Sequence, residues 1–209
     1  MHKLDPSRSD LPPSCRAAAE RWRSCCPPRG ETPRLETYDE ILRHYISTYR
    51  PAAAAEMDFY RSLRSLAEVV GWAGNALAPN GRRHSHQQRI PASVLQGAHA
   101  TLRRTDFGWC HTFEDLHRAV SDLILGIQGI GELMVYDTAL RIGAYLRLEP
   151  ETVYLHAGTR TGARALGLRG EGGRLAMSRL PAALRQLSAR EAEDCLCIYK
   201  DALANARSQ

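Results

Sequence analysis

The segment 125–131, Leu-Gly-Ile-Gln-Gly-Ile-Gly, constrains the fold of this 209-residue chain more than any other. On both sides of it, apolar residues recur at spacings of three and four, which is typical of helices with one buried face. Two glycines flanking one aliphatic residue allow the backbone to turn tightly, and Ile130 is placed to fill the gap between the helices. The sequence therefore predicts a pair of helices joined by a tight turn at about 116–146.

Signals for helix starts recur along the rest of the chain. Thr37 with Glu40, and Ser188 with Glu191, have the spacing of capping boxes, in which a hydroxyl and a carboxylate each satisfy a free backbone N–H. Prolines suited to a first helical turn stand at positions 51, 91, 150 and 181. Helices are expected over 38–49, 52–77, 91–104, 112–126, 132–146 and 189–204, with short ones after 150 and 181. Since no stretch alternates apolar and polar residues for long enough to require a strand, the predicted fold class is all-α.

The two ends of the helical region differ in composition. Residues 1–34 are rich in Pro, Ser, Arg and charge, and we expect a flexible N-terminal arm with only a short Ala-rich helix over 15–23. Residues 35–209 are expected to form a single helical domain. Within it, the stretch 158–173 contains six glycines and is expected to be flexible.

Charge and cysteine content narrow the function classes. The net charge of +5 comes from arginine, whose planar fork suits phosphate as well as carboxylate. The sequence contains no signal peptide and no apolar run of roughly 18 residues, so a cytoplasmic protein without a membrane partner is expected. Its six cysteines are expected to be reduced there, and without a paired CxxC or an HxxxH spacing neither a metal nor a cofactor is predicted.

The segment 125–131 and its flanking helices resemble the helix-hairpin-helix motif of DNA-binding proteins. In such a turn the N–H groups of Gly129, Gly131 and the next helix start face outward, where the helix dipole also favours a phosphate. These contacts read the backbone and not the bases, so the resemblance implies sequence-tolerant binding to duplex or branched DNA. The alternative is a hairpin that only packs two helices. Glu132 favours this alternative, because its carboxylate repels a phosphate.

Arginines gather after the hairpin. Arg160, Arg164 and Arg169, with two further arginines at 174 and 179, recur through the glycine-rich stretch, where Glu171 is the opposing acid. A basic segment of this kind can follow a phosphate backbone. We therefore place these three arginines with Gly129, Ile130 and Gly131 as candidate nucleic-acid-binding residues, the alternative being a solvated loop.

A partial resemblance extends over about 116–166 to the helix-hairpin-helix DNA glycosylase superfamily, which acts in DNA repair. A hairpin, a helix, a Pro-containing link and the segment Val-Tyr-Leu-His at 153–156 follow one another in similar order. The family's catalytic aspartate would fall near 153–156, where the chain has no acid, and the lysine of bifunctional members would fall near Leu133. The resemblance thus implies the scaffold without its catalytic residues.

Three residues are weak candidates for catalysis. Asp137 lies four residues before Arg141 on the second hairpin helix, where it either forms an ordinary ion pair or acts as a base in a pocket. Glu151 and Lys200 are the other two. The enzymatic hypothesis is a glycosylase-like enzyme acting on modified or damaged bases, and the third hypothesis is a helical adaptor that binds another protein. The sequence leaves the oligomeric state and the choice between DNA and RNA open.

Overall fold

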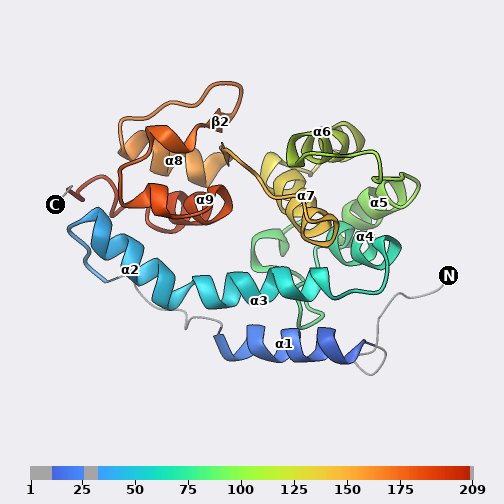
Figure 1. The fold of residues 1–209 in the computed structure, drawn as a ribbon. Coiled ribbons are helices and arrows are strands. Elements are labelled where there is room, and N and C mark those ends of the chain that lie inside the picture. The colour runs from blue at the N-terminus through green and yellow to red at the C-terminus, as the bar shows by residue number, and fades with distance from the viewer. Residues whose placement is uncertain (1–10, 26–32, 208–209) are drawn as a thin grey trace. The chain divides into compact units, whose positions relative to one another are not determined.

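The computed structural model describes residues 11–25 and 33–207, and most of them are helical (Figure 1). This confirms the predicted all-α fold. Much of the expected N-terminal arm, residues 1–10 and 26–32, lies outside the described residues. The described residues form two compact units: the first comprises 11–25 and 52–149, and the second comprises 33–51 and 150–207.

The first unit is a cluster of helices. Its helices are α1 (Pro13–Cys25), most of α3 (Arg50–Arg61), α4 (Leu66–Gly74), α5 (Ala92–Leu102), α6 (Phe113–Ile124) and α7 (Glu132–Leu146), with a short 3-10 turn η2 at Ser85–Gln87. Helix α7 packs against both α4 and α6, and α5 packs against α4 and α6 (Figure 1). Leu116 and Ile124 on α6 and Met134 on α7 are buried. The periodic apolar residues on either side of the 125–131 turn therefore supply part of this core.

Helix α1 lies in the segment that the sequence assigned to the arm. It covers the expected 15–23 helix and buries Cys15 and Ala18. The Cys15 thiol donates a hydrogen bond to the carbonyl oxygen of Ser62 at 3.0 Å, and burial raises the pKa of this thiol. Residues 13–25 are thus packed onto the first unit.

The prediction of one helix over 52–77 is wrong, because two helices occupy this range. Helix α3 ends at Arg61, and α4 begins after Ser65, whose hydroxyl accepts from the amide of Glu68 at 3.2 Å. The Glu68 carboxylate accepts from the amide of Arg64 at 2.9 Å. A local cap therefore interrupts an apolar pattern that by itself reads as one continuous helix.

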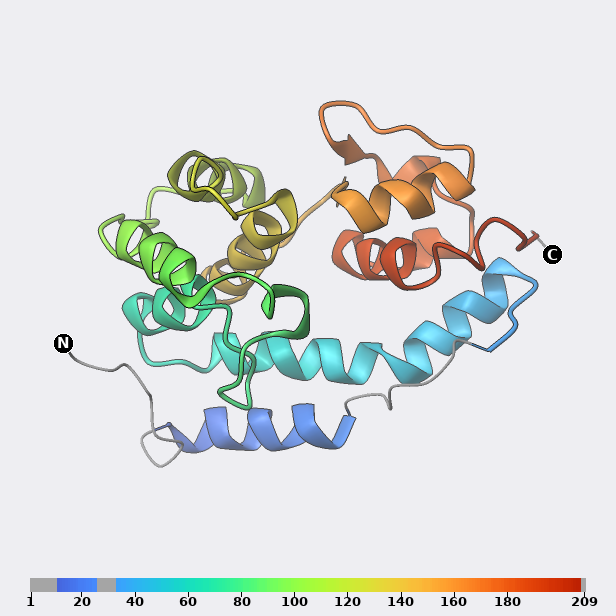
Figure 2. The same cartoon turned by 180° about the vertical axis from the view of Figure 1, so that it is seen from behind.

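The second unit combines helices with one small sheet. Its elements are α2 (Tyr38–Thr48), β1 (Val153–Tyr154), α8 (Ala157–Ala165), β2 (Arg174–Leu175), the 3-10 turns η3 (Met177–Arg179) and η4 (Leu184–Gln186), and α9 (Ala189–Ile198). Strands β1 and β2 are antiparallel, with Val153 opposite Leu175. Helices α8 and α9 lie side by side (Figure 2). Leu184, Leu196 and Tyr199 are among the residues of the core beneath them.

Several expectations for the second unit are wrong. The stretch after Pro150 forms strand β1 in place of a helix, since Val153 and Tyr154 pair with β2. The glycine-rich stretch expected to be flexible is helical in its first half, as α8. After Pro181 only the 3-10 turn η4 forms, and α9 ends at Ile198, short of residue 204.

No helix in the described ranges combines the length and apolar character that crossing a lipid bilayer requires.

Candidate nucleic-acid interface

The hairpin turn lies between the end of α6 and the start of α7. Gly129 has a φ of +96°, a backbone conformation that side-chain-bearing residues rarely adopt. The amide of Ile130 donates to the carbonyl oxygen of Ile127 at 2.9 Å, which closes the turn. The Ile130 side chain is only 8% exposed, so it fills the space beneath the turn as the sequence predicts.

The outer side of this turn is open. Gly129 and Gly131 are exposed, and a Cβ added at Gly131 would have no atom within 4 Å. Gly131 is the N-cap of α7 and supplies no side-chain hydrogen bond to it, so the first-turn amides of α7 rely on acceptors other than a capping side chain. The positive end of the helix dipole lies here as well. The exposed Glu132 is the negative group in this first turn, and it opposes an incoming anion.

Helices α6 and α9 begin on their own capping side chains. At α6, Thr112 accepts from the amide of Asp115 at 3.1 Å, and the hydrogen bond from Thr112 lowers the pKa of the Asp115 carboxyl. At α9, Ser188 and Glu191 form the predicted capping box, and Arg50 binds Glu191 at 2.7 Å. Burial alone would raise the pKa of Glu191, but the Ser188 amide and the Arg50 charge outweigh it and lower this pKa.

The candidate arginines line one pocket in the second unit. Arg160 and Arg164 are one turn apart on α8, and Arg169 follows in the loop after it. The cavity has a volume of about 400 Å³, and its remaining lining residues are Leu155, Ala163, Leu168, Gly170 and Gly173. Among the described residues that line it there is no carboxylate. The structure therefore brings these three arginines together, in the second unit, while the hairpin belongs to the first.

Asp137 belongs to a polar cluster inside the first unit. The guanidinium of Arg141 lies 3.7 Å from both the Glu56 and the Asp137 carboxylates, and its side chain is only 3% exposed. Gln87 donates from its amide nitrogen to Asp137, and His84 Nε2 lies 3.4 Å from Glu56. The ion pair between Asp137 and Arg141, one of the two interpretations made from the sequence, is therefore present, and it belongs to a larger buried network.

Charge and packing both shape this cluster. Burial works against the charge of Arg141, but electrostatic interactions with Tyr60, Asp137 and Glu56 outweigh it and raise the pKa of Arg141. Burial likewise raises the pKa of Tyr60, whose hydroxyl donates to the carbonyl oxygen of Leu77 at 2.5 Å. Within the described parts of the chain, neither Gln87 Oε1 nor Arg141 Nη1 has a hydrogen-bond partner. Buried polar atoms without partners cost stability unless a water or a ligand satisfies them.

The other two catalytic candidates do not belong to this cluster. Glu151 is exposed just before β1, and Lys200 is half-buried just after α9, both in the second unit. Sequence reasoning missed Glu56, His84 and Gln87. The last two lie in a stretch whose polar and basic composition reads as an exposed loop, and only the fold turns Gln87 inward, where it is 1% exposed.

A second buried polar pair was also missed. His156 Nε2 is hydrogen-bonded to the Glu193 carboxylate, and the two side chains are 5% and 7% exposed. The backbone amide of His156 donates to the Thr159 hydroxyl at 2.8 Å, which fixes the start of α8. Thirty-seven residues separate His156 from Glu193, so no local spacing could reveal the pair.

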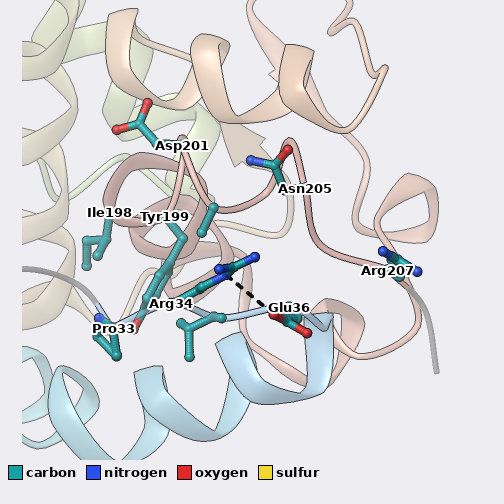
Figure 3. Close-up of a pocket in the computed structure, with 10 residues that line it drawn as sticks. Pro33, Arg34, Glu36, Ile198, Tyr199, Asp201, Asn205 and Arg207 are labelled. Atoms are coloured by element: carbon teal, nitrogen blue, oxygen red, sulfur yellow. Dashed lines mark ion pairs between the residues drawn. The ribbon is translucent and has the colours of Figure 1, made fainter.

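The second unit also contains a groove of about 880 Å³ between the segment 33–36 and the chain after α9 (Figure 3). Its lining carries both charges, including Arg34, Glu36, Asp201 and Arg207. Arg34 and Glu36, two residues apart on the same side of the groove, pair at 3.4 Å, and both are largely exposed (Figure 3). With its charges mixed and partly paired, this groove has less preference for an anion than the arginine pocket has.

Comparisons of the chain with protein-family profiles, with curated proteins and with solved structures find no match. Within residues 11–25 and 33–207, no three His, Cys, Asp or Glu side chains come together as a metal site would require.

Proposed function

We propose that this protein binds DNA through its phosphate backbone, without strong sequence preference, and that the turn at 125–131 makes the contact. The proposal rests mainly on the difference in burial between the residues of the turn. Ile130 is buried and holds the two helices, while Gly129 and Gly131 are exposed beside the start of α7. An exposed turn of this kind presents backbone N–H groups and a helix dipole to a phosphate.

The charge of the chain supports the same proposal. The net charge is +5, and Arg160, Arg164 and Arg169 surround one cavity without a described acidic neighbour in its lining. Arginine pairs with phosphate in a bidentate manner, which makes it the residue type expected at such a contact. Binding of this kind weakens steeply as salt is added, because each phosphate contact releases counterions.

The test is a set of binding curves for duplex, single-stranded and branched DNA over a range of salt concentrations. Gly131→Leu places a bulky side chain over the start of α7 and is expected to weaken binding by about tenfold and to flatten the salt dependence. The matched control is Gly97→Leu, since Gly97 is exposed on α5 and its Cβ position is equally open. Arg160→Glu is expected to weaken binding as well. Undiminished binding in both Gly131→Leu and Arg160→Glu would overturn the proposal.

A second candidate function, favoured by the polar cluster around Asp137, is a glycosylase-like enzyme acting on modified or damaged bases. Asp137 is close to a buried guanidinium and an amide, and Gln87 Oε1 is an acceptor without a partner in the described chain. In this hypothesis Asp137 acts as the base and Gln87 contributes to ligand recognition.

This candidate is tested by incubating the protein with duplexes that contain single modified bases and measuring base release. Asp137→Asn is expected to abolish release, while Glu151→Gln, at an exposed position outside the cluster, is expected to leave it unchanged. Circular dichroism on the same samples checks that Asp137→Asn is folded. Absence of release from every substrate by the unmodified protein would remove the enzymatic candidate.

A further inference from the structure

We infer that the arginine pocket of the second unit binds a terminal phosphate, that is, a phosphomonoester carried by a nucleoside. The inference begins with the placement of charge. Arg160 and Arg164 lie at positions i and i+4 of α8, on one face of the helix, and both line the same cavity. Arg169 adds a third positive charge to the same cavity. Such a concentration of charge is stabilised when an anion occupies the space between the side chains.

Two of these guanidinium groups are available to a ligand. Arg164 and Arg169 are exposed, and within the described residues neither side chain forms an ion pair. The loop that carries Arg169 is fixed from outside the pocket, because Arg179 donates to the carbonyl oxygen of Arg169 at 2.7 Å. Arg169 is therefore held in place through its backbone, while its side chain stays free to bind.

The charge of a terminal phosphate suits this pocket better than the charge of an internal phosphate within a strand does. A phosphomonoester carries close to two negative charges at neutral pH and offers three acceptor oxygens, whereas a phosphodiester carries one charge and continues into a strand on both sides. The two available guanidinium groups, those of Arg164 and Arg169, match this double charge, and each fork can bind phosphate oxygens in a bidentate manner.

The remaining lining explains why the phosphate is expected to belong to a nucleoside. Leu155, Ala163 and Leu168 give the pocket an apolar side, and its volume of about 400 Å³ exceeds the need of a bare phosphate. Cavities of roughly 300 Å³ and more hold small organic ligands, with a few polar groups that fix their orientation. A sugar and base fit this apolar side, with the phosphate directed at the arginines.

The inference rests on the proposed function only in that a nucleic acid would be the source of the nucleotide. Two sources share the chemistry, namely a phosphorylated strand end and a free mononucleotide. The hairpin and the pocket make separable contributions: both add to the affinity for every DNA, the pocket through its positive charge, but only the pocket distinguishes strands that carry a terminal phosphate from those that do not.

The experiment measures the affinity of the full chain for one oligonucleotide with either a 5′-phosphate or a 5′-hydroxyl end, at constant salt. Because charge-assisted hydrogen bonds to several oxygens are added, the phosphorylated strand is expected to bind about tenfold more tightly. Arg164→Gln and Arg169→Gln are each expected to bring this ratio close to one. Arg43→Gln, at an exposed position on α2 in the same unit, is the matched control and is expected to keep the ratio. Gly131→Leu is expected to weaken both strands equally.

Calorimetric titrations with deoxyadenosine monophosphate and with deoxyadenosine distinguish the two sources. Stronger binding of the monophosphate supports a site for free nucleotides, and binding of phosphorylated strands alone supports a site for strand ends. These titrations retain their meaning even if hairpin-dependent DNA binding fails. Equal affinities for both strands together with equal affinities for both small molecules would overturn the inference, as would a ratio preserved in both Arg164→Gln and Arg169→Gln.

Discussion

Helices α7 and α8 both begin without a serine or threonine at the N-cap, but their starts differ in accessibility. Helix α7 begins on Gly131, which is exposed and has open space where a side chain would stand. Helix α8 begins on His156, which is buried against Glu193 and whose amide is bound by Thr159. The comparison teaches that the start of α7 is open to solvent, whereas the chain's own side chains occupy the start of α8.

The glycines of the two helices serve different purposes. At the hairpin, Gly129 supplies a positive φ that allows the turn. On α8, Gly158 and Gly162 allow close contact with α9: a Cβ at Gly158 would lie 2.7 Å from Cys197 Sγ, and one at Gly162 would overlap the carbonyl oxygen of Leu196. The hairpin glycine Gly129 therefore allows a turn, and the α8 glycines Gly158 and Gly162 allow a close interface between two helices.

The largest effect is expected from breaking the buried pair at the start of α8. Glu193→Leu removes the carboxylate that binds His156 and is expected to lower the free energy of unfolding by about 3 kcal/mol, because a buried polar group loses its partner. Urea denaturation followed by circular dichroism measures this. The double variant His156→Leu/Glu193→Leu is expected to recover part of the loss, and additive losses in the double variant would show that the two side chains do not act as a pair.

A smaller effect is expected from the interface glycine of α8. Gly162→Ala forces α8 away from Leu196 and is expected to cost about 1–3 kcal/mol of unfolding free energy. The control is Gly97→Ala on α5, where the Cβ position is open and alanine is expected to stabilise the helix by about 0.5–1 kcal/mol. Equal responses at the two positions would contradict the role of Gly162 in packing.

The smallest effect on stability is expected at the open start of α7. Glu132→Lys replaces a charge that favours the helix dipole and is expected to cost only about 0.3–1 kcal/mol. The same change removes repulsion of phosphate, and DNA affinity is expected to rise by about threefold with a steeper salt dependence. Asp122→Lys, an identical charge change at an exposed position of α6, is the control for net charge. An equal gain in affinity from both variants would show that the start of α7 has no special role.

Local signals predicted the helical part of the fold well. The capping boxes at Thr37 and Ser188 and the tight turn around Ile130 are present as expected, because each depends on residues only a few positions apart. The errors arose where a short local signal competed with a longer pattern. Ser65 interrupts an apolar stripe, and the Val153–Tyr154 strand requires a partner twenty residues further along.

The candidate site was predictable in part. Arg160, Arg164 and Arg169 were singled out as basic residues in a glycine-rich stretch, but only the packing of α8 and the following loop places them around one cavity. The neighbours of Asp137 could not be predicted, since Glu56 lies far away in sequence on α3 and Gln87 lies in a polar, basic stretch that is typical of an exposed loop.

By itself, the sequence determined the helical class and the position of the hairpin turn, because caps, glycines and apolar spacing act over one or two helical turns. Only the tertiary structure decided which helix start is open and which is sealed, since His156 is held by a glutamate 37 residues away. Tertiary structure likewise decided that Gly162 allows α8 to pack closely on α9 and that Gly131 leaves the start of α7 open. What surrounds a glycine depends on the parts of the chain that fold against it.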